Sequence, residues 1–157
     1  MINYKISYTK PHRHYVDFQL ITKTNGVDKM YFQLAAWRPG RYELANFAQN
    51  IRNWKAKDDN GNLLNFKKIT KDLWQVNTKS IQKVSITYSF YANTLDAGSC
   101  YLDEYQLYLN PVHCFFYILD RMQETYALSF DIPKDYDLAS SLVNKNKTLI
   151  ANSYDEL

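Results

Sequence analysis

Apolar and polar residues alternate along most of this chain, and a two-residue period is typical of half-buried β-strands. The clearest run is residues 84–90, in which Val84, Ile86, Tyr88 and Phe90 occupy one face and small polar residues occupy the other. The same pattern predicts further strands near residues 4–8, 14–20, 30–34, 51–56, 63–66, 73–76, 101–109, 112–119 and 125–132. Turn signals separate these runs about every 8–12 residues. We therefore predict an all-β fold, an antiparallel β-sandwich of about ten strands.

Two turn sequences predict hairpins between neighbouring strands. Thr24-Asn25-Gly26 separates two alternating runs, and Asn-Gly is the strongest short signal for a tight hairpin turn. Asp59-Asn60-Gly61-Asn62 separates residues 51–56 from residues 63–66 and predicts a second hairpin there.

The length of 157 residues suits one domain with its own core. Pro133 stops the last regular strand, so we assign residues 1–133 to the β-sandwich. Residues 134–157 are predicted to form a last hairpin around Asn144–Lys147, followed by a segment with no strand partner. Such an end is expected of a domain cut from a longer chain.

Charge and hydropathy exclude several classes of function. The formal net charge is only +3 and the basic residues are interleaved with acidic ones, so nucleic acid is not an expected partner. No apolar stretch approaches the roughly 18 residues that cross a bilayer, and the start reads as a strand rather than a secretory signal. We therefore expect a cytoplasmic chain with no membrane contact. Its two cysteines, Cys100 and Cys114, are then expected to be buried or half-buried thiols, with a single bridge between them as the alternative.

The side chains that most often carry chemistry do not assemble into a predicted site. His12 and His14 would share a face if both lay on a strand, but no third or fourth ligand is spaced to complete a metal site. We expect instead that Pro11 breaks the strand, with His12 exposed and His14 a half-buried strand residue. The adjacent residues His113 and Cys114 point to opposite faces of a strand, so they are not expected to pair as base and nucleophile. The carboxylates of the Asp103-Glu104 pair diverge for the same reason. We therefore predict no catalytic, cofactor-binding or metal-binding residue in this chain.

A cluster of aromatic residues has three open interpretations: core, interdomain face, or stacking platform for a sugar or peptide. Its members are Tyr101, Tyr105, Tyr108, Phe115, Phe116 and Tyr117.

The most distinctive segment is Trp37-Arg38-Pro39-Gly40-Arg41-Tyr42. Proline fixes one backbone angle and Gly40 permits a positive φ, so the segment is predicted to be a tight corner that places its side chains. Residues 42–50 follow with apolar side chains at helical spacing, which predicts one short helix.

This corner, with the following Phe47-Ala48-Gln49-Asn50-Ile51, resembles the N-terminal domain of the glycyl aminopeptidase family, PDZ-bearing gluzincin zinc metallopeptidases. Pro11-His12-Arg13-His14-Tyr15-Val16 resembles the first hairpin of that family, and Tyr154-Asp155-Glu156-Leu157 resembles its run-in to the catalytic domain. The resemblance therefore covers nearly the whole chain.

The resemblance implies a non-catalytic N-terminal domain of a zinc aminopeptidase. Zincins hold their metal with H-E-x-x-H on a helix, whereas the only histidines here are His12, His14 and His113, and none precedes a glutamate. The implied zinc then belongs to a missing catalytic domain, toward which residues 134–157 are a truncated linker. The implied partners are that catalytic domain and the peptide substrate of the full-length protein.

Two interpretations of the corner stay open. Its Trp and Tyr plug the end of the sandwich, or the corner and the helix after it face the catalytic domain and wall its peptide cleft. In the second case Arg38 and Arg41 meet carboxylates of that domain or of a substrate. The interface or cleft residues are then Trp37, Arg38, Pro39, Gly40, Arg41, Tyr42, Phe47 and Asn50. The alternative function is a free-standing β-sandwich module that binds peptide or carbohydrate; a third is a structural domain with no ligand.

Overall fold

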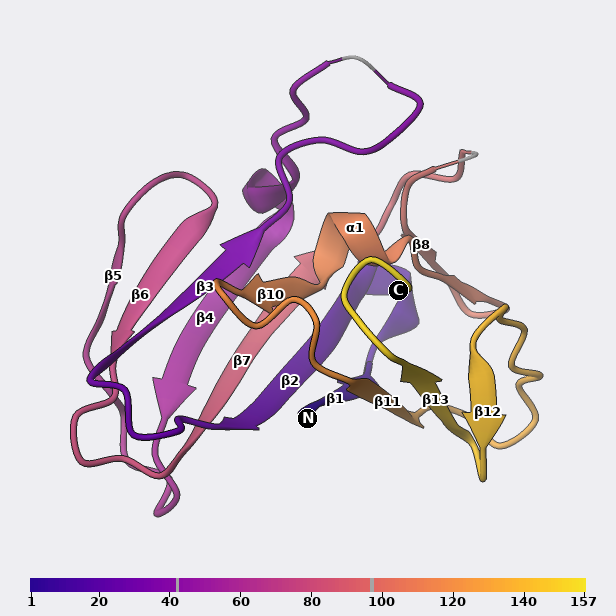
Figure 1. The fold of residues 1–157 in the computed structure, drawn as a ribbon. Helices are drawn as coiled ribbons and strands as arrows, with labels where there is room; N and C mark the ends of the chain where they lie inside the picture. The colour runs from indigo at the N-terminus through magenta and orange to yellow at the C-terminus, as the bar shows by residue number, and fades with distance from the viewer. Residues whose placement is uncertain (42, 97) are drawn as a thin grey trace.

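The computed structural model describes residues 1–41, 43–96 and 98–157, and these residues form an all-β fold of two facing sheets (Figure 1). The larger sheet has seven strands, in the spatial order β12 (Val143–Lys145), β13 (Thr148–Ala151), β11 (Tyr126–Asp131), β1 (Ile2–Ser7), β2 (Tyr15–Lys23), β7 (Lys83–Tyr91) and β4 (Ile51–Lys57). The smaller sheet has the order β10 (Phe116–Ile118), β3 (Lys29–Leu34), β6 (Leu73–Asn77) and β5 (Phe66–Lys68). A separate pair is β8 (Tyr101–Leu102) with β9 (Leu107–Tyr108). The predicted all-β sandwich is confirmed.

The N-terminal strand lies inside the larger sheet. It pairs antiparallel with β2 on one edge and parallel with β11 on the other, with Ile2 opposite Tyr126 and Ser7 opposite Asp131. The strand pairs named for the described residues are otherwise antiparallel. A strand from the start of the chain is therefore held next to one from its end.

Aromatic rings from both sheets fill the space between them. The ring of Tyr88 in the larger sheet meets that of Phe116 in the smaller sheet, with centroids 4.9 Å apart. Trp54 stacks on Trp74 across the same gap at 5.9 Å. Tyr4 adds a polar link, because its hydroxyl donates to the Phe116 carbonyl at 3.0 Å and accepts from the Phe116 N–H at 2.9 Å. Large apolar area and satisfied polar atoms together hold the two sheets in contact.

The turn at Asn25-Gly26 has the expected backbone, with φ of 55° and 77°, but it does not join a hairpin. It leads from β2 in the larger sheet to β3 in the smaller one, so the first predicted hairpin is wrong. The second turn closes as expected, with Lys57 bridging Leu63, yet β5 then pairs with β6 rather than with β4. A turn signal fixes a reversal of direction; burial of the next apolar face decides which strands pair.

The predicted helix within residues 42–50 is realised only as the 3₁₀ turn η2 (Phe47–Asn50). A second 3₁₀ turn, η1 (Pro11–Arg13), precedes β2. Within the described residues, no helix combines the length and the apolar character required to cross a membrane.

The strands predicted at residues 101–109 and 112–119 are wrong in part. The first is the short hairpin β8–β9, and the second begins with one helical turn, α1 (Pro111–Cys114), before β10. Asn110 precedes this turn in an extended conformation, and proline suits the first helical position because its φ is already fixed. The aromatic and β-branched residues that follow masked this signal.

The last predicted hairpin is confirmed as β12–β13, with positive φ at Asn146 and Lys147 in its turn. β13 also pairs with β11, so this hairpin extends the larger sheet. Ala151 at the end of β13 and Tyr154 beyond it are buried in the core. The division of the chain at residue 133 stays a prediction.

Candidate functional site

The corner at Trp37 joins the two sheets. It follows β3 of the smaller sheet and leads through η2 to β4 of the larger one, and Figure 1 shows it rising beyond the end of the sandwich. The Arg41 N–H donates to the Arg38 carbonyl at 3.4 Å across Pro39 and Gly40, and Gly40 has φ of 86°. Proline followed by a residue of positive φ is the pattern of a type II turn. The predicted tight corner is therefore present.

Apolar side chains of the corner face solvent. Trp37 is 55% exposed and Leu44 is 79% exposed, so neither fills the end of the sandwich. Pro39, Gly40 and Arg41 are exposed as well, whereas Arg38 is half-buried. Tyr42 lies outside the described residues.

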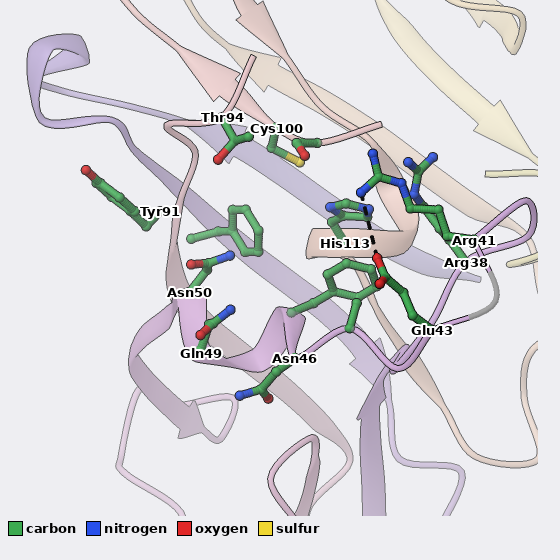
Figure 2. Close-up of a pocket in the computed structure, with 14 residues that line it drawn as sticks. Arg38, Arg41, Glu43, Asn46, Gln49, Asn50, Tyr91, Thr94, Cys100 and His113 are labelled. Carbon is green, nitrogen blue, oxygen red and sulfur yellow. Dashed lines mark ion pairs between the residues drawn. The ribbon is translucent and has the colours of Figure 1, made fainter. Parts of the chain in front are cut away.

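A pocket of about 250 Å³ opens at the base of the corner. Figure 2 shows its two sides: the guanidinium groups of Arg38 and Arg41 lie with the His113 ring on one side, and three side-chain amides lie on the other. Its lining residues are Arg38, Arg41, Glu43, Ala45, Asn46, Phe47, Gln49, Asn50, Phe90, Tyr91, Thr94, Ser99, Cys100 and His113.

The structure brings four predicted residues to this pocket: Arg38, Arg41, Phe47 and Asn50. Trp37, Pro39 and Gly40 lie on the corner beside it and are not among its lining residues. The pocket therefore joins the corner to η2 and to α1, which is distant in sequence.

His113 of α1 forms the floor of the cationic side. Only 7% of it is exposed, and its ring stacks on Phe47 with centroids 3.8 Å apart. Burial lowers the pKa of His113 to about 4, and the positive charge of Arg38 acts in the same direction. The ring is therefore neutral at pH 7, and its buried Nε2 has no hydrogen-bond partner among the described residues.

The two arginines differ in their surroundings. Arg41 lies 3.9 Å from Glu43 and 3.9 Å from Asp96, so two carboxylates share it. For Arg38 no ion pair is found within the described residues. Its guanidinium instead lies against Gly98, where a Cβ would overlap it, so a larger residue at this position would displace the Arg38 head group.

Cys100 lines the pocket and Cys114 lies behind it. Both thiols are buried and free, as predicted, with their Sγ atoms 3.9 Å apart. Burial raises the pKa of the Cys114 thiol. Within the described residues no hydrogen bond joins the His113 ring to either thiol, so a base–nucleophile pair is not assembled.

The other candidate residues have local structural roles. His12 lies exposed in η1, as expected from Pro11. His14 follows with φ of 58° and its Nδ1 2.6 Å from the Leu102 carbonyl, one residue before β2, so its predicted place on a strand is wrong. Asp103 accepts hydrogen bonds from the N–H groups of Tyr105 and Gln106 and closes the β8–β9 turn. In residues 1–41, 43–96 and 98–157, no group of three His, Cys, Asp or Glu side chains is placed to hold a metal ion.

The aromatic cluster is divided between core and surface. Phe115 and Phe116 are buried, whereas Tyr105 is 85% exposed and Tyr108 is 42% exposed. Tyr101 and Tyr117 are half-buried. The cluster therefore is not one stacking platform.

Sequence reasoning missed His113 and Gly98 as parts of the pocket. His113 was weighed only as the strand neighbour of Cys114, whereas α1 turns it toward η2. The signal that was present is Asn110-Pro111, an expected start of a helical turn. No local sequence pattern identifies Gly98, because its role depends on the side chain of Arg38, 60 residues earlier in the sequence.

Comparisons with known proteins place the chain in a family. Residues 3–157 match the family described as the Peptidase M61 N-terminal domain. The chain is similar to the solved structure of an aminopeptidase N family protein from Idiomarina loihiensis, with 25% identity and a TM-score of 0.89, covering 100% of this chain and 28% of that one. It is also similar to an M1 zinc metallopeptidase from Deinococcus radiodurans, with 13% identity and a TM-score of 0.44, covering 97% of this chain and 38% of that one. No curated protein matches the sequence.

The match to the family spans nearly the whole chain, whereas the chain spans well under half of each solved structure. This protein therefore belongs to the Peptidase M61 N-terminal domain family.

Proposed function

We propose that this chain is the non-catalytic N-terminal domain of a zinc aminopeptidase, packs on the catalytic domain of that enzyme, and forms part of its peptide cleft through the corner at Trp37. The family of the chain and the greater length of the Idiomarina loihiensis protein support the first part. Zinc and the general base then belong to the remainder of the parent protein, together with the PDZ domain that the resemblance implies.

The observation that carries the cleft proposal is the exposure of Trp37. A Pro-Gly turn holds this indole away from the core, 55% exposed, beside a pocket lined by charged and amide side chains. Large apolar groups held in solvent by a rigid turn contribute little to the stability of the domain itself. Contact with another protein surface or a peptide would bury them and recover that free energy.

The cytoplasm remains our proposed compartment. Cys100 and Cys114 are neighbouring free thiols, which a reducing compartment maintains. When the protein is purified without reductant and then unfolded, we expect both thiols to react fully with a thiol reagent.

The size of the native gene product tests the domain proposal. An antibody raised against this chain should detect a band several times larger than 18.6 kDa in a lysate of the source organism. A band near 18.6 kDa would contradict the proposal and favour the alternative, a free-standing module that binds peptide or carbohydrate.

Trp37→Ala tests the cleft proposal in the full-length protein. We expect kcat/KM for peptide hydrolysis to fall roughly tenfold or more, as loss of a buried aromatic contact does. Leu63→Ala is the matched control, because Leu63 is 69% exposed on the β4–β5 turn, outside the pocket, and should leave kcat/KM unchanged. Equal kcat/KM for Trp37→Ala and the parent protein would contradict a role in the cleft.

A further inference from the structure

The pocket at the base of the corner has two chemically different sides. Arg38, Arg41 and His113 supply N–H donors on one side, and Asn46, Gln49 and Asn50 supply amides on the other (Figure 2). Guanidinium groups suit carboxylates, while side-chain amides both donate to and accept from peptide groups. The pocket can therefore bond a carboxylate and the peptide group next to it at the same time.

One arginine on the cationic side, Arg38, has no carboxylate partner within the described residues. Arg41 is shared between Glu43 and Asp96, each at 3.9 Å, whereas no carboxylate within the described residues is paired with Arg38. Asp96 also accepts a hydrogen bond from the Gly98 N–H at 2.8 Å, and Gly98 lies against the Arg38 guanidinium. Glu43 is the acidic side chain that an incoming carboxylate meets in the pocket, and Arg41 faces it.

A second observation points to a ligand on the same side. The Nε2 atom of His113 is buried without a hydrogen-bond partner, and leaving a buried polar atom unpaired costs free energy. As a neutral imidazole with a proton on Nε2, the ring donates to an oxygen placed beside Arg38. One carboxylate in the pocket would satisfy both groups.

The volume of the pocket limits the size of the ligand group that it can hold. At about 250 Å³ the pocket is smaller than the roughly 300–1,000 Å³ usual for whole small-molecule ligands. It suits one end of a chain or one side chain, with the rest of the ligand leaving toward the exposed Trp37.

We infer that this pocket binds the carboxylate of a peptide, either its C-terminal carboxylate or an acidic side chain, with Arg38 as the main charged contact. Assigning that peptide to the substrate of the parent enzyme rests on the proposed function. The inference adds the class of substrate: short or acidic peptides that are anchored by a carboxylate.

The 157-residue chain itself provides the first test. Isotope-labelled protein is titrated with N-acetyl-Ala-Ala and with the same dipeptide as its C-terminal amide, and binding is followed by NMR at the Arg38 Nε–H and the side-chain amides of Asn46, Gln49 and Asn50. We expect the free carboxylate to bind at least roughly tenfold more tightly than the amide, because a charged hydrogen-bonded contact is lost. N-acetyl-Asp-Ala amide then distinguishes a side-chain carboxylate from a terminal one.

Two variants test the role of Arg38 in different ways. Arg38→Gln removes the charge, and Gly98→Ala keeps the charge but displaces the guanidinium by adding a Cβ where that group lies. Both substitutions should weaken N-acetyl-Ala-Ala binding roughly tenfold. The NMR spectra of both variants should stay well dispersed, which shows that they are folded. Arg13→Gln is the matched control: Arg13 is exposed and outside the pocket, so the same change of charge should alter the affinity less than about twofold.

Three results would overturn the inference: no binding, equal binding of the carboxylate and the amide, or equal losses in Arg38→Gln and Arg13→Gln. None of these results would contradict the cleft proposal, which the Trp37→Ala variant tests separately. Binding to the isolated chain but not to the full-length enzyme would show that a carboxylate of the catalytic domain already fills the pocket, which excludes a substrate anchor while the domain proposal stands.

Discussion

The space between the two sheets and the open end of the sandwich differ in what surrounds their buried polar groups. Between the sheets, the Tyr4 hydroxyl bonds both the N–H and the carbonyl of Phe116, and the Tyr88 hydroxyl donates to the Cys114 carbonyl at 2.6 Å. At the open end, the Nε2 atom of His113 is buried without a partner within the described residues. The buried Trp54 Nε1 atom and Tyr126 hydroxyl also lack a partner within the described residues, but they lie in the packed core, whereas His113 lines a pocket. The unpaired polar atom that a ligand can approach therefore lies at the open end.

Apolar groups show the same contrast. Phe18, Tyr88 and Phe116 are at most 2% exposed between the sheets, while Trp37 is 55% exposed at the corner. Substitution between the sheets should therefore change stability, and substitution at the open end should change binding with little effect on stability. The following predictions test this difference, beginning with the largest expected effect.

Phe116→Ala should cause the largest loss of stability. The Phe116 side chain is fully buried and its ring meets both Trp74 and Tyr88, at 5.0 and 4.9 Å. Truncating a buried phenylalanine typically costs about 3–5 kcal/mol, because transfer free energy is lost and a cavity remains. Urea unfolding of the isolated chain gives the value. A cost under about 1 kcal/mol, typical of a surface position, would contradict the contrast.

Acidification should destabilise the domain through His113. The unfolded chain protonates this residue near its ordinary pKa of 6.5, but the folded chain keeps it neutral down to about pH 4. The unfolded state then binds more protons between these values, so stability falls by about 2–3 kcal/mol as the pH falls from 6.5 to 4. Unfolding free energies across this range should decline less steeply in His113→Gln. Parallel pH profiles for the two proteins would contradict the assignment.

Tyr4→Phe should cost about 1–3 kcal/mol, because it leaves the buried Phe116 N–H without its hydrogen-bond partner. Tyr126→Phe is the matched control. Tyr126 is equally buried, but its hydroxyl has no partner within the described residues, so removing it should change stability by less than about 0.5 kcal/mol or increase it. Denaturation midpoints of the two variants make the comparison, and equal losses would contradict a stabilising role for the Tyr4–Phe116 hydrogen bonds.

Leu44→Ser should have the smallest effect on stability. Leu44 is 79% exposed on the corner loop, so exchanging it for a polar residue should change the unfolding free energy by less than about 0.5 kcal/mol. Thermal melts of the isolated chain measure it. A larger loss would mean that the loop packs on the domain more than its exposure indicates.

Local patterns predicted the elements of the fold better than their arrangement. Alternation at residues 84–90 identified β7 and its buried face, because a two-residue period follows directly from strand geometry. The Asn25-Gly26 turn was recognised but misassigned to a hairpin, since whether β3 pairs with β2 or crosses to another sheet depends on burial far along the chain.

The pocket was predictable only where its residues are close in sequence. Arg38, Arg41, Phe47 and Asn50 come from one distinctive segment, and the pattern of that segment placed them together. His113 reaches the pocket through α1 and the packing of two sheets, which no local period encodes. Tertiary contacts determined this half of the site, as they generally override local propensity.

The parallel pairing of β1 with β11 has a consequence for how the protein is made. Residues 2–7 pair with β2 on one side, but their other side finds its partner only in residues 126–131, so the larger sheet cannot close until residue 131 has left the ribosome. Contacts between residues so far apart in sequence also slow folding, because the entropy cost of closing the long loop comes before the stabilising contacts form. During synthesis β1 has only β2 as a neighbour and presents an open hydrogen-bonding edge, so the nascent domain is most exposed to aggregation just before its last strands emerge.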